Sequence, residues 1–224
     1  MDRKIVLGVL GFIVVLVTIG FLLPDKMLND KDTLPWHIEH PTPQTTHVLG
    51  ITLGQSTVPE AERKYQEKAE YSLFKSPDGK MGAEIFFEEV VLNGLKAKVT
   101  LTVDVPQAEI GPMYERGLRM SATGSGSKRI TMQPDDVARV RTLPITSLTY
   151  IPVIKLDEQV LQQRFGTPAQ KVRETKNGVV HWLYPDHGLD MTVPTGDKPI
   201  FQYVTPNNFE LLRKPLLAEG EVLQ

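Results

Sequence analysis

The sequence predicts an α+β protein with an N-terminal transmembrane helix and two tandem modules, each made of a short helix and an antiparallel sheet. A charge-free apolar stretch predicts the membrane helix. Two short helical patterns, each followed by a run of strand patterns rather than by strand–helix alternation, predict the modules. Asn93-Gly94 lies between strand patterns and is the preferred two-residue hairpin turn, so its strands are expected to be antiparallel. Asn177-Gly178 and His187-Gly188 are expected at further turns.

Residues 1–24 are predicted to be a transmembrane anchor. Residues 5–23 carry no charge, and these 19 positions would reach about 28 Å as a helix, close to the roughly 30 Å hydrocarbon core of a bilayer. A cleaved signal peptide is the alternative, but residues 21–25, FLLPD, lack the small residues of a cleavage site. Arg3 and Lys4 precede the span and Lys26 and Lys31 follow it, so the basic residues nearly balance and the amino terminus tips the balance. A short head before a long soluble body usually stays in the cytoplasm, so we expect a single-pass protein of the bacterial inner membrane with a cytoplasmic N-terminus and periplasmic modules.

The composition argues against several classes of function. The chain has 224 residues, a formal net charge of -2 and no cysteine. A nucleic-acid binder would show a basic excess, so we expect no nucleic-acid partner. Without cysteine, disulfides, thiolate metal sites and thiol catalysis are impossible.

Residues 25–47 are predicted to be a linker, because they show no periodicity and contain three prolines. Zinc-ligand residue types occur here, in His37, Glu39, His40 and His47. Pro35 and Pro41 flank His37 and His40 and disfavour the helix that would place both imidazoles on one face. We therefore expect neither a metal nor another cofactor.

Residues 48–106 are predicted to form the first module. Thr57 and Glu60 have the spacing of a capping box at the start of a helix. Residues 97–105, AKVTLTVDV, alternate apolar and polar side chains with the period of a half-buried strand. Residues 107–150 are expected to connect the modules through two short helices, a flexible SATGSGSK loop and a strand near residues 145–153. That loop lacks the spacing of a phosphate-binding loop.

Residues 151–213 are predicted to form the second module, and residues 214–224 a C-terminal tail. Acidic residues stand at the start of the helical pattern and Arg164 at its end, as the helix dipole favours. Gly166 and Pro168 then predict its termination. The strand patterns that follow are AQKVRET, VVHWLYP, GLDMTVP and PIFQYVT.

The order of Gly54, Ser56 and Thr57, a short helix, an FGTP stop at residues 165–168 and antiparallel strands from Lys171 resembles the repeat of β-lactamase-inhibitor-protein-like domains. It is also similar to the SmpA/OmlA lipoproteins of the outer-membrane assembly machinery. The resemblance covers residues 48–105 and 151–205. It departs from the family in having an apolar anchor in place of a lipidated cysteine, and the first copy lacks the glycine-proline stop. The resemblance implies a two-layer α+β module that binds other proteins in the envelope, without chemistry.

A hydrolase is the alternative that the histidines suggest. His181 or His187 could act as a base with Asp186 or Asp190. We expect structural roles instead, because the sequence of residues 186–188, DHG, is typical of a turn. His181 alternates with Trp182 and Tyr184 along its strand, so it is expected on the opposite, half-exposed face.

The expected function is scaffolding or recognition of other envelope proteins by a membrane-anchored protein that is not an enzyme. Aromatic residues, which are favoured at interfaces, are the candidate partner-binding residues: Tyr150, Trp182, Tyr184, Phe201 and Tyr203. The KPIFQYVTPNNF segment is a candidate sheet edge that could accept a partner strand. A third hypothesis is binding of a lipid or another apolar ligand between the modules, which requires a sizeable apolar pocket.

Overall fold

The computed structural model describes residues 30–122, 126–193 and 197–223. The predicted transmembrane anchor, residues 1–24, lies outside these ranges. Within them, no helix has the length and apolar character required to cross a membrane. Residues 31–224 cluster as one unit, and the fold described below is that of this unit.

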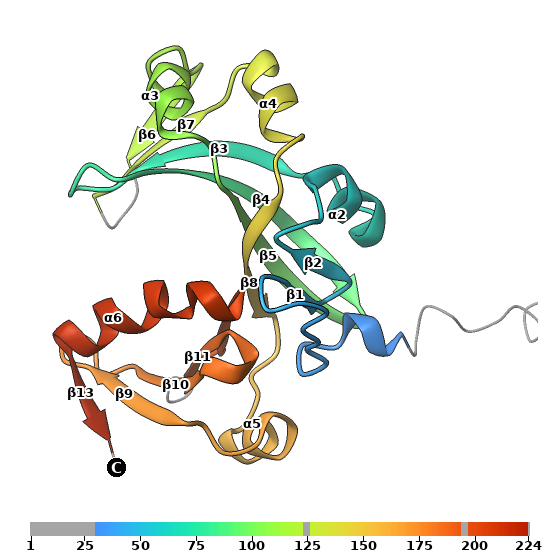
Figure 1. The fold of residues 1–224 in the computed structure, drawn as a ribbon, viewed down its shortest axis with the longest axis vertical. Helices are drawn as coiled ribbons and strands as arrows, with labels where there is room; N and C mark the ends of the chain where they lie inside the picture. The colour runs from blue at the N-terminus through green and yellow to red at the C-terminus, as the bar shows by residue number, and fades with distance from the viewer. Residues whose placement is uncertain (1–29, 123–125, 194–196, 224) are drawn as a thin grey trace, which may run out of the picture. The chain divides into compact units, whose positions relative to one another are not determined.

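The fold is α+β, as predicted, and its strands form one large antiparallel sheet instead of two separate module sheets (Figure 1). A separate two-stranded ladder pairs β1 (Thr46–Val48) with β2 (Ile51–Leu53). The large sheet has eleven strands in the order β13-β9-β10-β11-β12-β8-β5-β4-β3-β7-β6. Their bounds are β3 (Glu70–Lys75), β4 (Met81–Leu92), β5 (Leu95–Val103), β6 (Arg119–Ala122), β7 (Lys128–Thr131), β8 (Ile145–Pro152), β9 (Gln170–Glu174), β10 (Val180–Tyr184), β11 (Leu189–Val193), β12 (Ile200–Val204) and β13 (Gly220–Leu223).

Strand β8 joins the two predicted modules into one sheet. It pairs with β5 on one side and β12 on the other, and Tyr150 lies opposite both Val99 and Phe201. The strand therefore crosses the predicted boundary between residues 150 and 151. Because β8 completes the hydrogen bonding of both halves, the halves share a continuous core.

Capping residues and glycine set the ends of several of the helices. They are α2 (Val58–Tyr65), α3 (Gln107–Glu115), α4 (Pro134–Val140), α5 (Glu158–Phe165) and α6 (Phe209–Glu219), with 3-10 turns η1 (Lys31–Thr33), η2 (Pro185–His187) and η3 (Pro206–Asn208). The capping box of α2 is confirmed, since the Thr57 amide donates to Oε2 of Glu60 at 2.8 Å. The predicted stop of α5 is confirmed at Gly166, whose φ of 77° is a conformation that glycine adopts readily.

One face of the sheet carries the main core. Along residues 97–105 the apolar side chains are buried, so the predicted alternation is confirmed. Helix α2 packs on this face, with the Tyr65 and Phe87 rings 5.3 Å apart and nearly perpendicular. The Asn93-Gly94 turn between β4 and β5 is also confirmed, because both residues have positive φ as a type I′ turn requires.

The opposite face of the C-terminal half is covered by α6. This face of β9, β10 and β12 buries Val172, Leu183 and Val204, which pack with Phe209 of the helix. Within the segment predicted to be a tail, residues 214–224, the described residues 214–223 form the end of α6 and the strand β13, which pairs with β9 (Figure 1). Pro215 lies inside the helix and is a sequence signal against it.

Residues 31–47, predicted to be part of a linker, pack on the folded body. The Tyr203 hydroxyl donates to the Pro35 carbonyl at 2.8 Å. Trp36 contacts the edge of the Phe165 ring, and the Arg164 guanidinium lies 4.7 Å from the centre of the indole. These contacts fix the chain across the second half of the sheet before β1 begins.

Candidate functional site

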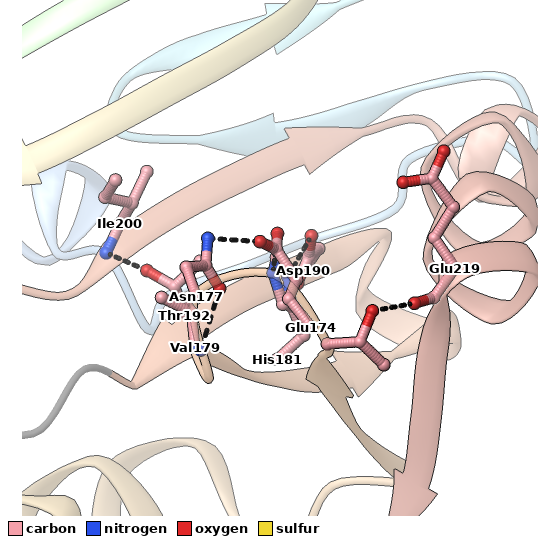
Figure 2. Close-up of polar contacts among 9 residues, drawn as sticks. Glu174, Asn177, Val179, His181, Asp190, Thr192, Ile200 and Glu219 are labelled. Atoms are coloured by element: carbon pink, nitrogen blue, oxygen red, sulfur yellow. Dashed lines mark hydrogen bonds and ion pairs between the residues drawn. The ribbon is translucent and has the colours of Figure 1, made fainter.

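Three titratable side chains meet on the face of the sheet that α6 covers. Nδ1 of His181, on β10, lies 2.9 and 3.0 Å from the two carboxylate oxygens of Asp190 on β11. Nε2 lies 2.9 Å from Oε1 of Glu174 at the end of β9. Figure 2 shows the three side chains converging from adjacent strands. We call this group the His181 cluster.

The pairing of the strands explains why these residues meet. His181 lies opposite Val172 on β9 and opposite Thr192 on β11. Glu174 and Asp190 are each two residues from those partners, so all three side chains project from the same face. Their diagonal spacing is bridged because the side chains are long.

The electrostatics of the cluster favour an imidazolium. Burial lowers the pKa of His181, but hydrogen bonds and the charges of Asp190 and Glu174 outweigh burial and hold the pKa above its usual value. The Asp190 side chain is 2% exposed and the Glu174 side chain 34%. Asn177 also donates to Glu174. Because each ring nitrogen of His181 faces a carboxylate, neither is free to accept a proton from a nucleophile in this geometry.

The predicted half-exposed position of His181 is wrong, since the residue is 6% exposed. The strand periodicity placed its side chain on the correct face, opposite Trp182 and Tyr184. The error arose because helix α6, which covers that face, is not predicted from the sequence, where Pro215 interrupts its pattern.

The other residues of the hydrolase hypothesis lie in the turn after β10. Asp186 and His187 belong to η2, and Gly188 closes it with a φ of 58°. In the part of the chain that the structure describes, no hydrogen bond joins His187 to a carboxylate. Burial, and secondarily the charge of His40, lower the pKa of His187. A pocket of about 260 Å³ adjoins Glu174 and Glu219, but His181 does not line it.

The histidines weighed as zinc ligands have separate partners. His47 contacts Oδ1 of Asp32 and, through Nδ1, the Thr52 hydroxyl at 2.8 Å. His37 pairs with Glu39 at 3.2 Å, and His40 lies 3.3 Å from the Thr45 carbonyl. Among residues 30–122, 126–193 and 197–223, no group of three or more metal-ligating side chains is found.

The candidate partner-binding aromatic residues lie in the core. Their exposed fractions are between 0% and 4% for Tyr150, Trp182, Tyr184, Phe201 and Tyr203. They share the face that packs against α5, where Phe165 stacks on Phe201 at 5.5 Å. A partner could not contact them without rearrangement, so we do not retain them as a binding surface.

The open edges of the sheet are β6 and β13. The prediction that KPIFQYVTPNNF is an edge is wrong, because β12 lies between β11 and β8. Among the described residues, strand β6 pairs with β7 alone, and all four of its side chains are exposed. Exposed Leu118 precedes it, and Met120 within it is 56% exposed. An unpaired row of backbone donors and acceptors with exposed side chains is a template for another strand.

A pocket of about 330 Å³ lies where α6 approaches the first half of the sheet. Its apolar lining includes Met81, Val105, Ile110 and Leu211. A second pocket, of about 210 Å³, shares Thr146 and Asn208 with the first, so the two are contiguous. The first volume falls within the range of small-molecule sites, about 300–1,000 Å³.

Comparisons with protein-family models, with curated proteins and with solved structures find no match for this chain. The resemblance to β-lactamase-inhibitor-protein-like and SmpA/OmlA repeats therefore stays a prediction.

Proposed function

We propose that this protein is a non-catalytic binding protein of the bacterial envelope that recognises an extended segment of a partner protein at the β6 edge. In this proposal residues 1–24 anchor the chain in the inner membrane, and two tandem helix-plus-sheet modules, merged through β8, lie on the periplasmic side. The anchor is supported by the length of the charge-free stretch. Addition of a strand to an open sheet edge is a common mode of peptide recognition.

The exposed strand β6 is the observation that carries the proposal. Stable proteins protect such an edge with a short strand, charged side chains, proline, a bulge or a covering element, and β6 is short and carries Arg119. In β6 the sequence RMSA contains no proline, and Met120 and the preceding Leu118 offer apolar contact area. The opposite edge, β13, carries Glu221 and exposed Val222.

Site-specific photo-crosslinking tests the proposal. A photoreactive amino acid replaces Met120 in the full-length protein in membranes, and a matched variant carries it at exposed Lys214 on α6. We expect the Met120 variant to crosslink to one defined segment of another protein, identified by sequencing the joined peptides. Equal adducts from both positions, or none from position 120, would contradict the proposal.

The anchor has its own test, which is protease treatment of spheroplasts. Digestion of the folded body from outside supports a periplasmic location. A body that is protected until the inner membrane is lysed would show the reverse orientation.

Binding of an apolar ligand is a second candidate function, favoured by the pocket between α6 and the first half of the sheet. Leu211, which lines it, is 72% exposed and can be replaced without disturbing the core. Titration with a fluorescent fatty acid should give saturable binding that Leu211→Glu weakens. Identical titrations of the two proteins would exclude this pocket as the site.

A further inference from the structure

The sheet end that contains β6 concentrates positive charge. Four basic side chains lie on β3, β6 and β7, in a chain whose formal charge is -2. Within the described residues, none of the four forms an ion pair with a carboxylate, although Arg116 and Lys80 nearby do. The four are Lys75, Arg119, Lys128 and Arg129, and we call them the cationic edge.

Pairing of the strands at this end of the sheet costs free energy unless an anionic partner lies nearby. Lys75 lies directly opposite Lys128 across the β3–β7 ladder, and like charges in that position destabilise a sheet. Two of the cations form cation–π contacts with aromatic rings: Lys75 Nζ lies 5.3 Å from the centre of the Tyr114 ring, and the Arg129 guanidinium lies 5.0 Å from the centre of the Phe74 ring. Among the described residues, the buried Nε of Arg129 has no hydrogen-bond acceptor. The charge of Arg129 is partly offset by Glu84 of β4, because the arginine opposes the rise that burial causes in the pKa of that carboxyl. The remaining positive charge at this edge belongs chiefly to Lys75, Arg119 and Lys128.

The two faces of β6 differ in chemistry. Arg119 and Ser121 lie opposite Thr131 and Arg129 of β7, so the two arginines share one face. On the other face, Met120 lies opposite the buried side chain of Ile130. Lys128, opposite Ala122, and Lys75 lie on this face too, further along the strands. A strand added beside β6, about 4.8 Å away, would present alternate side chains to an arginine face and to a methionine face.

We propose that β6 binds an extended partner segment in which acidic residues alternate with apolar ones. The acidic side chains lie beside Arg119, and the apolar side chains lie beside Met120. Arg129 lies one strand further from the edge, with its guanidinium over Phe74 of β3, and adds positive potential to the face that Arg119 occupies. This inference rests on the proposed function and specifies the partner's chemistry. An anionic lipid surface would satisfy the charge but would not use the backbone edge of β6, so the observations favour a peptide strand.

Fluorescence anisotropy with labelled peptides tests the inference on the full-length protein in a neutral detergent. The probes are ten-residue peptides that alternate Glu with Val, Gln with Val and Lys with Val. We expect saturable binding of the Glu-Val peptide, weaker binding of the Gln-Val peptide and no binding of the Lys-Val peptide. The variant Arg119→Gln should weaken the Glu-Val peptide roughly fivefold, as expected for the loss of one partly exposed charge pair of about 1 kcal/mol.

Two matched controls separate charge from strand pairing. Lys176→Gln removes an exposed charge next to α6 and should leave peptide binding unchanged. Met120→Pro and Ser121→Pro are compared because the amides of neighbouring strand residues point in opposite directions, one toward β7 and one away from the sheet. One of the two prolines therefore removes a backbone N–H that an added strand would use as a donor. We expect at least one of these variants to keep the wild-type thermal melt and lose the peptide.

The possible outcomes distinguish the inference from the proposed function. If crosslinking at position 120 captures a neutral or basic segment, the function stands and the acidic-partner inference is overturned. If the Glu-Val peptide fails to bind, or binds both proline variants, the inference is also overturned. Charge-dependent binding to phosphatidylglycerol vesicles without peptide binding would identify a lipid surface instead.

Discussion

Asp190 accepts hydrogen bonds from the His181 ring at 2.9 and 3.0 Å, and both side chains are almost completely buried beneath α6. The second ring nitrogen of His181 contacts Glu174, which is partly exposed. The histidine therefore joins β9, β10 and β11 through side chains as well as through the backbone. This arrangement makes the His181 cluster a stabilising element under α6. Substituting its carboxylates one at a time should lower the free energy of unfolding by different amounts.

Asp190→Asn should destabilise the protein much more than Glu174→Gln. Removing one partner of a buried ion pair costs about 3–5 kcal/mol, because the remaining charge is left uncompensated. The Glu174 pair is partly solvated, so its loss should cost roughly 1 kcal/mol or less. Urea unfolding of both variants gives the two free energies. Equal losses would show that burial does not separate the two carboxylates.

The two histidines near the second half of the sheet should titrate in opposite directions from their usual value of 6.5. The raised pKa of His181 contributes stability that is present below pH 6.5 and is lost as the pH rises through its folded value. The lowered pKa of His187 contributes stability that is present above pH 6.5 and is lost as the pH falls. NMR titration of the ring protons measures both; a His181 pKa below that of His187 would contradict the assignment.

Leu183→Ala should cost about 2–5 kcal/mol, the usual range for deleting a buried leucine side chain. Leu183 is 0% exposed in the core between the sheet and α6. Leu211 lies on the exposed face of α6, and Leu211→Ala is the matched control, which should change the free energy of unfolding by about 0.5 kcal/mol or less. If thermal melts of the two variants coincide, α6 does not cover this face in solution.

The same substitution should have opposite effects at two glycines. Gly94 has a φ of 77°, and a Cβ there would meet no atom within 4 Å, so Gly94→Ala introduces backbone strain alone. We expect a loss of about 1–2 kcal/mol. Gly82 in β4 has the same free space without the positive φ, and Gly82→Ala should gain roughly 0.5–1 kcal/mol. Chemical denaturation measures both, and matching signs would refute the turn assignment.

The parts of the fold that follow local rules could be predicted from the sequence. The alternation of residues 97–105, the Thr57 cap, the Gly166 stop and the Asn93-Gly94 turn each depend on a few neighbouring residues. Helix α6 was not predicted, because Pro215 interrupts its pattern. The error at His181 follows from that omission.

The candidate site depended on topology rather than on local pattern. Periodicity cannot show which strand lies at an edge, so β12 was expected there and β6 was not. The like-charge pair of Lys75 and Lys128 joins residues far apart in sequence, and only the register of β3 and β7 brings them together. A run of basic residues at 128–129 beside a polar loop was the available signal.

Amide hydrogen exchange of the full-length protein, with and without the alternating Glu-Val peptide, tests the proposed binding edge most directly. Outward-facing amides of β6, residues 119–122, should exchange slowly only when the peptide is present, because they gain acceptors from the added strand. Amides of β13 should not change. Peptide-dependent protection at β13, or unchanged exchange in β6 at saturating peptide, would contradict strand addition at this edge.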